Sequence, residues 1–443
     1  MNFQEQYRQK LKSADEAVKV VKSGDWVDYS VSLGFPELLD AALSKRKDEL
    51  FDVNIRGYLM LKPIQAVECD PEREHFTYNS WHCGGYERKL CDRGLCNYIP
   101  MVFRNVADYY RRYLTVNVAM MAVPPMDKHG YFNFSLNNAT AKATLDAADV
   151  VILEINDKLP RVFGGSDEMI HISEVDMIVE GNHGDLVTLG SPAATDIDNI
   201  IAKTVVENMR DGSTIQIGIG GMPNAVGKMI ADSDLKNLGI HTELLVDAYL
   251  DMYKAGKITN AAKNIDKNKG VFGFALGSQE LYDWTEENPG LITHPIDYVN
   301  APEVIANLDN FVSINNCISV DLYGQICAES AGTRHISGTG GQLDFLTGAF
   351  MAKGGQSFIC MTSSFTDKEG NLKSRFLPSF NGDIVTDPRS QGFLLVTEYG
   401  MFNMAGRSSW ERAEGLINLA HPEHREDLIK AAEKQKIWRK SNK

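Results

Sequence analysis

The stretch IQIGIGGMPNAVGKMIADSDLKNLGIHTE, from position 215 to 243, constrains the fold of this chain more than any other. Its apolar start predicts a buried strand, glycines at 218, 220 and 221 then open a tight turn, and Pro223 stands where a helix would begin. After that helix a second strand-like segment, from Leu238, ends at Glu243. Such a turn exposes backbone N–H groups at the positive end of a helix. These groups suit a phosphate or a developing oxyanion.

Short apolar, β-branched runs alternate with longer helical segments along the whole chain, and DVVILEI at 149–155 is the clearest buried strand. This alternation is typical of open α/β sheets, so the predicted fold class is α/β. The other strand candidates are Leu114–Met121, Thr214–Gly218, Leu238–His241, Phe311–Ile314, Ser357–Met361 and Leu394–Thr397. The helix candidates are Ala14–Lys22, Asp196–Asn208, Met222–Ile230 and Ser408–Leu419.

The length of the chain predicts two domains. With 443 residues, 43% of them hydrophobic, it can bury two sizeable cores. The segment EGNHGDLVTLGSPAA, at 180–194, combines glycine, proline and polar residues between periodic segments. We therefore expect a boundary there, with one open-sheet α/β domain over residues 1–187 and a second over residues 188–443.

The net charge of −14 disfavours nucleic acid and anionic membranes as partners, because both bind basic surfaces. A phosphorylated small molecule needs only a few local cations. Lys257, Lys263, Lys267 and Lys269 cluster after Glu243, although a solvated face is the commoner role of such lysines. The start of the chain is charged, and no stretch approaches the roughly 18 apolar residues of a spanning helix. We expect a cytoplasmic protein.

Seven cysteines, an odd number scattered over a long chain, indicate reduced thiols and not a disulfide framework. His82, Cys83, Cys91 and Cys96 place four nitrogen or sulfur ligands close together in sequence. Their spacing fits a metal site poorly, since adjacent residues 82 and 83 cannot easily ligate one ion and no Cys-x-x-Cys pair is present. The sequence therefore predicts no metal site.

Two chemistries fit the stretch that ends at Glu243. In a nicotinamide-binding fold a glycine turn is followed, some twenty residues later, by an acid that binds a ribose hydroxyl. That fingerprint is broken here, because Pro223 occupies the position of its third glycine. In the second chemistry Glu243 is a nucleophile that attacks an acyl thioester, while the coenzyme lies along the glycine turn.

Two further segments predict turns that lead into helices. SGTGGQLDF, at 337–345, lacks the Gly-Lys-Ser/Thr of a phosphate-binding P-loop and by itself predicts a glycine turn before a helix at Asp344. YVNAPEVI, at 298–305, predicts a turn into a helix with Pro302 near its first position. Neither segment identifies a chemistry alone.

Taken in order, these segments resemble a known family. GIGGMPNAVG, HTELLVDAY, SINNCISVDLYGQ, SGTGGQLDF, VTEYG and RAEGLINLAHPE are similar to motifs of the family I coenzyme A transferases. MDKHGYFNF, VILEIND and HISEVDMIVEG extend the similarity through the first half of the chain. The chain is most similar to the members that act on butyryl-CoA with acetate and on 4-hydroxybutyrate. The segment SVSLGFPELL, at 30–39, does not match the butyryl enzymes, which leaves the donor chain length open.

The resemblance assigns roles to individual residues. It implies that Glu243 is the catalytic glutamate, and that the Asn300 amide and the Gly341 backbone N–H stabilise the oxyanion. It also implies two paired α/β domains of the same open-sheet type. The positions implied to contact coenzyme A are Gly218, Ile219, Gly220, Gly221, Met222, Ile318 and Gly340.

The resemblance also implies a ping-pong CoA-transferase. Glu243, with a reference pKa near 4.3, is expected to be ionised at neutral pH without a neighbouring base. It would form a glutamyl-CoA thioester and pass coenzyme A to acetate, with butyryl-CoA as the favoured donor and 4-hydroxybutyryl-CoA or propionyl-CoA as alternatives. An acyl-CoA hydrolase is the nearest rival. The expected substrates are small molecules, no tightly bound cofactor or metal is implied, and family members suggest a homodimer or homotetramer.

Overall fold

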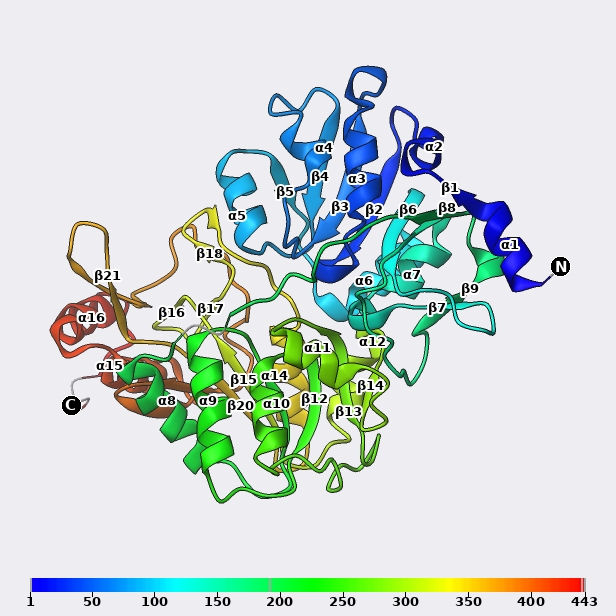
Figure 1. The fold of residues 1–443 in the computed structure, drawn as a ribbon. Coiled ribbons are helices and arrows are strands. Elements are labelled where there is room, and N and C mark those ends of the chain that lie inside the picture. The colour runs from blue at the N-terminus through cyan, green and yellow to red at the C-terminus, as the bar shows by residue number, and fades with distance from the viewer. Residues whose placement is uncertain (1, 191–192, 440, 442–443) are drawn as a thin grey trace.

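The computed structural model describes residues 2–190, 193–439 and 441. Two eight-stranded sheets organise these residues, one above the other in Figure 1. The first sheet has the order β1-β10-β8-β6-β2-β3-β4-β5, and the second has the order β14-β13-β12-β11-β15-β20-β24-β25. All neighbouring pairs are parallel except β24 and β25. The predicted α/β class with two open sheets is confirmed.

The first sheet and its helices come from residues before 181. Its strands are β1 (Leu11–Lys12), β2 (Trp26–Val31), β3 (Val53–Tyr58), β4 (Phe76–Ser80), β5 (Cys96–Tyr98), β6 (Val116–Val123), β8 (Ala148–Ile155) and β10 (Met177–Glu180). Its helices are α1 (Phe3–Lys10), α2 (Ala14–Ala17), α3 (Glu37–Ser44), α4 (Gln65–Glu68), α5 (Gly85–Asp92), α6 (Val106–Arg112) and α7 (Ala141–Asp146). A small pair, β7 (Tyr131–Asn133) and β9 (Met169–His171), stands beside it.

The second sheet and its helices come from residues after 195. Its strands are β11 (Thr214–Ile217), β12 (Gly239–Leu245), β13 (Gly270–Ala275), β14 (Leu291–Thr293), β15 (Phe311–Asn316), β20 (Gln356–Cys360), β24 (Leu394–Thr397) and β25 (Gly400–Asn403). Its helices are α8 (Asp196–Glu207), α9 (Gly221–Asp232), α10 (Asp247–Lys254), α11 (Gln279–Thr285), α12 (Ile296–Val299), α13 (Pro302–Ile305), α14 (Gln342–Met351), α15 (Ser409–Leu419) and α16 (Pro422–Lys434). Short strands form small additional sheets, namely β16 (Ser319–Asp321), β17 (Ile326–Cys327), β18 (Ser330–Ala331), β19 (Arg334–His335), β21 (Ser364–Thr366), β22 (Leu372–Ser374) and β23 (Phe376–Leu377).

Apart from the edge strands β1 and β25, the two sheets share one topology. In each, an inner strand (β2 or β11) is followed by three strands that are added on one side. The chain then returns to the other side of the starting strand (β6 or β15). Ligands of open α/β sheets bind beyond the carboxyl ends of the strands at this switch point. The topology therefore marks the carboxyl ends of β11 and β15, beside the glycine turn at 218–221, as a place to look for a site.

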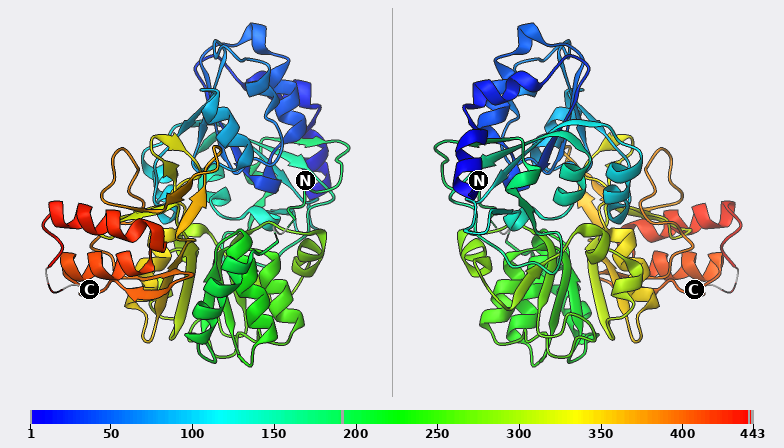
Figure 2. Two further views of the ribbon diagram at one scale, coloured as in Figure 1. Left: turned by 90° about the vertical axis from the view of Figure 1, so that its left-hand side faces the viewer. Right: turned by 90° about the vertical axis from the view of Figure 1, so that its right-hand side faces the viewer.

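A continuous apolar core joins the two halves of the chain. It contains Tyr58 and Phe103 from the first sheet region together with Phe274 and Phe345 from the second. The rings of Phe103 and Phe274 pack edge to face with centroids 6.3 Å apart. Backbone bonds also cross, such as the one from the Ala139 N–H to the Gly273 carbonyl at 3.0 Å. Figure 2 shows the halves in contact from both sides, with α15 and α16 set to one side of the second sheet.

Most predicted elements are present, with shifts of a few residues at their ends. The predicted helix over 14–22 is wrong in its second half, because α2 ends at Ala17 and a 3₁₀ helix covers Val18–Val20. Val18 and Val21 are buried there, and their β-branched side chains disfavour a longer helix. The strand predicted over 238–241 continues through Glu243 to Leu245. The exact boundary between residues 187 and 188 stays a prediction, and residues 191–192 of the predicted linker lie outside the described residues.

Three expectations drawn from composition can be compared with the structure. All seven cysteines carry free thiols, as predicted. None of the helices in the described part of the chain is long and apolar enough to cross a membrane. A phosphate-binding role for the lysines after Glu243 is wrong for Lys263, which is buried and donates to the Ile240 and Lys269 carbonyls at 2.9 and 2.7 Å, at the amino ends of β12 and β13. The cytoplasmic location stays a prediction.

A buried ion pair links β2 to β3 and predicts a large stability effect. Arg56 donates to Asp28 at 2.6 and 2.9 Å, and both side chains are almost fully buried. Arg56→Leu would leave the Asp28 carboxyl buried without its partner, so we expect the free energy of unfolding to fall by about 3–5 kcal/mol. Lys45→Ala is the control, because it breaks an exposed pair with Asp15 and should cost less than about 1 kcal/mol. Equal losses of unfolding free energy in the two variants, measured by urea unfolding, would contradict this prediction.

Candidate active site

A cavity of about 130 Å³ lies between the carboxyl ends of the two sheets, where the topology predicts a site. A cavity of about 150 Å³ holds a benzene molecule in another protein, so this one has room for a short acyl group. The first sheet contributes lining residues that follow β3, β4 and β5, namely Tyr58, Leu59, His82, Met101 and Phe103. The second contributes Gln216, Ile217, Gly218, Ile219, Glu243, Leu244, Phe274, Asn315, Gly341, Gln342 and Phe345.

The Glu243 side chain lines this cavity from β12 and is held by two hydrogen-bond donors. The Asn300 Nδ2 donates to Glu243 Oε2 at 2.7 Å, and the Gly341 backbone N–H donates to the same carboxyl group. Asn300 is fully buried at the end of α12, and its Oδ1 has no hydrogen-bond partner among the described residues. The structure thus brings together the three residues that the sequence resemblance implies for catalysis, although they are far apart in the chain.

Burial changes the ionisation of this carboxyl group. Loss of solvent raises the pKa of Glu243 to about 7, and the bonds from Asn300 and Gly341 oppose that rise only in part. The expectation that Glu243 is fully ionised at neutral pH without help is therefore wrong, because its pKa lies close to neutral pH. A weakly solvated carboxylate is a better nucleophile than one surrounded by water.

His241, two residues before Glu243, fixes the position of the asparagine. Its Nε2 lies 2.7 Å from the carbonyl oxygen of Val299, directly before Asn300. Burial lowers the pKa of His241 to about 3, so the ring is neutral and Nε2 carries the hydrogen that it donates to this carbonyl. The His-Thr-Glu sequence of β12 therefore positions Glu243 and also ties its strand to α12.

The glycine loop at 337–341 requires glycine at two positions. Gly340 has φ +54°, and Gly341 caps α14 with its backbone against the carboxyl group. A Cβ atom on Gly341 would lie 2.2 Å from Glu243 Oε2, so no side chain fits there. The first half of the chain holds this loop, since the Thr339 N–H donates to the Tyr98 hydroxyl at 3.0 Å and the Phe103 N–H donates to the Gly340 carbonyl at 3.2 Å.

The glycine turn at 218–221 lies on the other side of the carboxyl group. Gly220 has φ +123° and caps α9, as expected for a turn that only glycine adopts easily. Ile219 is 53% exposed and separates the Glu243 cavity from a second cavity of about 200 Å³. The second cavity is lined by Leu189, Gly190, Ile219, Gly220, Asn224, Val246, Asp247, Leu276 and Gly277. The turn therefore has open space on both sides.

Some predicted contact positions lie elsewhere. Met222 is buried in the core of the second sheet, so only its backbone can face a ligand. Ile318 lines neither cavity, and its N–H donates to the Cys327 carbonyl at 2.8 Å. The segment at 30–39 that does not match the butyryl enzymes lines a separate small cavity with Leu61 and Lys62.

Several lining residues were missed by the sequence reasoning. Tyr58, Met101 and Phe103 belong to no motif, and His82 was weighed only as a metal ligand. The signal that could have found them is their position at or shortly after the ends of β3, β4 and β5, but the sequence analysis predicted none of these three strands. That signal is usable only once the two sheets are known to meet at their carboxyl ends.

Family models agree with this architecture. The acetyl-CoA hydrolase/transferase N-terminal domain matches residues 1–188, and the acetyl-CoA hydrolase/transferase C-terminal domain matches residues 277–432. The two matches lie in the two halves of the chain and together cover most of it.

Curated relatives and solved structures match over almost the whole chain. The butyryl-CoA:acetate CoA-transferase of Anaerostipes caccae is 53% identical over 100% of both chains. The 4-hydroxybutyrate coenzyme A transferase of Clostridium kluyveri is 37% identical over 98% of this chain and 100% of its own. RipA from Yersinia pestis superposes with a TM-score of 0.89 at 34% identity, over 99% of this chain and 100% of its own. The chain therefore belongs to the acetyl-CoA hydrolase/transferase family and is a CoA-transferase.

Proposed function

We propose that this protein moves coenzyme A between a short-chain acyl-CoA, with butyryl-CoA favoured, and acetate, through a glutamyl-CoA thioester on Glu243. The observation that carries this proposal is a partly desolvated carboxyl group that faces an apolar cavity and is held by the Asn300 amide and the Gly341 N–H. The 53% identical relative named for butyryl-CoA and acetate supports the substrate pair.

The reaction conserves the thioester energy in covalent bonds. The Glu243 carboxylate attacks the thioester carbonyl, the C–S bond breaks, and coenzyme A leaves as a thiolate from an acyl-glutamyl anhydride. The thiolate then attacks the glutamyl carbonyl and displaces butyrate, which leaves a glutamyl-CoA thioester. Acetate repeats the two steps in reverse and leaves as acetyl-CoA. The only species required besides the protein are the coenzyme A thioester and the acid.

Asn300 and Gly341 serve two states of this cycle. Before reaction they donate to Glu243 and hold its carboxyl group toward the cavity. When that oxygen forms a bond to carbon, its charge falls and the negative charge moves to the former carbonyl oxygen. Donors already fixed at the site can stabilise that oxygen without reorganisation, and one such donor is typically worth about 2.7–4 kcal/mol.

The cavity favours an apolar acyl group. Phe103, Phe274 and Phe345 line it, and all three are buried. Two of its polar residues, Gln216 and Asn315, are hydrogen-bonded to each other at 3.0 and 3.1 Å, which reduces what they can offer to a substrate hydroxyl. This supports butyryl-CoA over 4-hydroxybutyryl-CoA, although one methylene is worth only about 1–3 kcal/mol and propionyl-CoA is expected to react as well.

An acyl-CoA hydrolase is the second candidate, because water could attack the same anhydride or thioester. Two observations favour transfer. The Glu243 cavity is mostly apolar, and the donors around the carboxyl group come from the protein itself. A site that excludes water protects reactive intermediates from hydrolysis.

The deciding experiment mixes pure protein with butyryl-CoA and isotope-labelled acetate and follows the products by mass spectrometry. Labelled acetyl-CoA without accumulating free thiol is the expected result. Free coenzyme A without label would replace the proposal with a hydrolase. If butyryl-CoA does not react but labelled acetate receives coenzyme A from 4-hydroxybutyryl-CoA, the mechanism stands and butyryl-CoA is rejected as the favoured donor.

Two substitutions separate the nucleophile from its donor. Glu243→Gln keeps the size of the side chain but replaces the nucleophilic carboxylate by a neutral amide, so we expect transfer to be abolished. Asn300→Ala removes one donor and should lower kcat by about 10²–10³ without abolishing the glutamyl-CoA adduct. Adduct formation is read by intact mass after incubation with butyryl-CoA. Full turnover by Glu243→Gln would refute the mechanism.

The raised pKa of Glu243 predicts opposite effects of pH on activity and stability. Because the carboxylate is the nucleophile, kcat/KM should rise with pH to a plateau with a midpoint near pH 7. The folded state holds the proton more tightly than the unfolded state, so this group costs stability as pH rises from about 4.5 to 7, by roughly 3 kcal/mol in all. The free energy of unfolding of Glu243→Gln, measured in urea relative to wild type, should therefore be higher at pH 8 than at pH 4.5 by about that much. A difference between variant and wild type that does not change with pH would contradict the raised pKa.

A further inference from the structure

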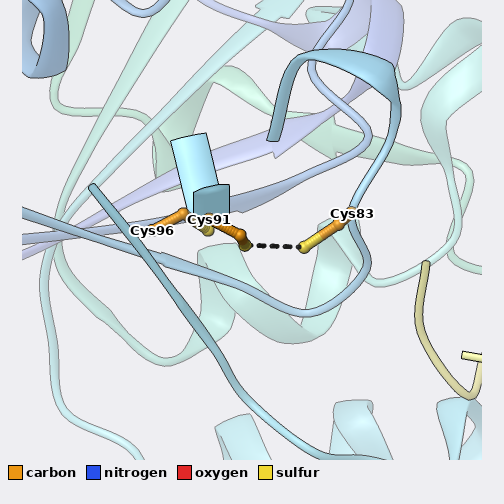
Figure 3. Close-up of side chains that lie close together, drawn as sticks. All are labelled: Cys83, Cys91 and Cys96. Atoms are coloured by element: carbon orange, nitrogen blue, oxygen red, sulfur yellow. Dashed lines mark hydrogen bonds between the residues drawn. The ribbon is translucent and has the colours of Figure 1, made fainter. Parts of the chain in front are cut away.

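Three thiols that the sequence reasoning dismissed as a metal site converge on one point beside the first sheet. Cys83 follows β4, Cys91 belongs to α5, and Cys96 begins β5 (Figure 3). Their sulfur atoms all lie within 4.8 Å of one another, and Cys83 Sγ and Cys91 Sγ are 3.7 Å apart. Cys83 and Cys96 are buried, while Cys91 is partly exposed. The cluster is therefore largely shielded but reachable from one side.

These separations match the geometry of a metal–thiolate site. Zinc binds cysteine sulfur at about 2.3 Å, and tetrahedral angles then place two such sulfurs about 3.8 Å apart. The Cys83–Cys91 separation already has this value. The other two separations, at most 4.8 Å, need only small side-chain rotations. A disulfide would use two sulfurs at about 2.05 Å and leave the third without a role.

Cysteine binds zinc as the thiolate, so the ion would displace the thiol protons of the cluster when it binds.

We propose that Cys83, Cys91 and Cys96 bind a zinc ion, with a water molecule in the fourth position. His82 takes no part, because its ring faces the glycine loop, where a Cβ on Gly338 would lie 2.8 Å from its Nδ1. This explains why His82 and Cys83 can be adjacent without competing for one ion. The site is separate from Glu243 and supplies no group to the transfer reaction.

The position of the cluster assigns the ion a structural role. The Cys83 N–H donates to the Ser337 carbonyl at 3.1 Å, and Arg88, in α5, donates to the Ile336 carbonyl at 2.8 Å. Both acceptors lead directly into the glycine loop that ends at Gly341. A metal that fixes Cys83 to α5 would therefore stiffen the wall that holds this loop in place.

Metal analysis of the purified, reduced protein tests the proposal. We expect one zinc ion per chain after anaerobic reconstitution, and thiolate-to-metal charge-transfer absorption when cobalt replaces zinc. Cys91→Ser should lose both signals and is the preferred variant, because its side chain is partly exposed. Cys69→Ser is the matched control, since Cys69 is also a partly exposed thiol of the first sheet region but lies outside the cluster. It should keep both signals.

Thermal stability gives a second readout that does not depend on the transferase reaction. A chelator should lower the melting temperature of the wild type and of Cys69→Ser, but not that of Cys91→Ser. The proposal is overturned if reduced wild type binds neither zinc nor cobalt, or if Cys91→Ser retains the ion. Detection of a Cys83–Cys91 disulfide after peroxide treatment, without any metal binding, would identify the cluster as a redox pair instead.

Discussion

The structure depends on one costly arrangement, the burial of the Glu243 carboxyl group between two halves of the chain. Removal from water raises its pKa to about 7, and only the Asn300 amide and the Gly341 N–H compensate. Both donors belong to the second half of the chain, but the first half closes the cavity over them. The desolvated state of Glu243 therefore exists only when the two halves are packed together.

The shared topology of the two sheets explains why both halves of the chain contribute to one site. Each sheet offers loops at its carboxyl ends, and the two sets face each other across the cavity. The second sheet supplies the carboxyl group, the amide and both glycine turns. The first supplies apolar walls and the bonds from Tyr98 and Phe103 that hold the glycine loop. A single sheet of this kind could carry the reacting groups but could not exclude water from them.

Much of the second half was predictable because its signals are local. A glycine turn between an apolar run and a helix, and Pro302 at the first turn of α13, follow from backbone geometry over a few residues. The residues around Glu243 could be named from the sequence through their resemblance to a family. The walls of the cavity could not, because Met101 and Phe103 look like any other core residues until the facing sheet is in place. Likewise, the prediction that the helix continues past Ala17 was wrong, because the burial of Val18 and Val21 outweighed the local pattern.

The sequence by itself determined the alternation of strands and helices and the two glycine turns, since each depends on residues that are neighbours in the chain. Through its resemblance to a family it also singled out Glu243 as the candidate nucleophile. Only the tertiary structure decided the ionisation of Glu243, the lining of the cavity and the meeting of Cys83, Cys91 and Cys96. A pKa depends on how much water a group loses, and a ligand set depends on distances in space. Neither the water that a group loses nor the distance between ligands can be predicted from the spacing of residues along the chain.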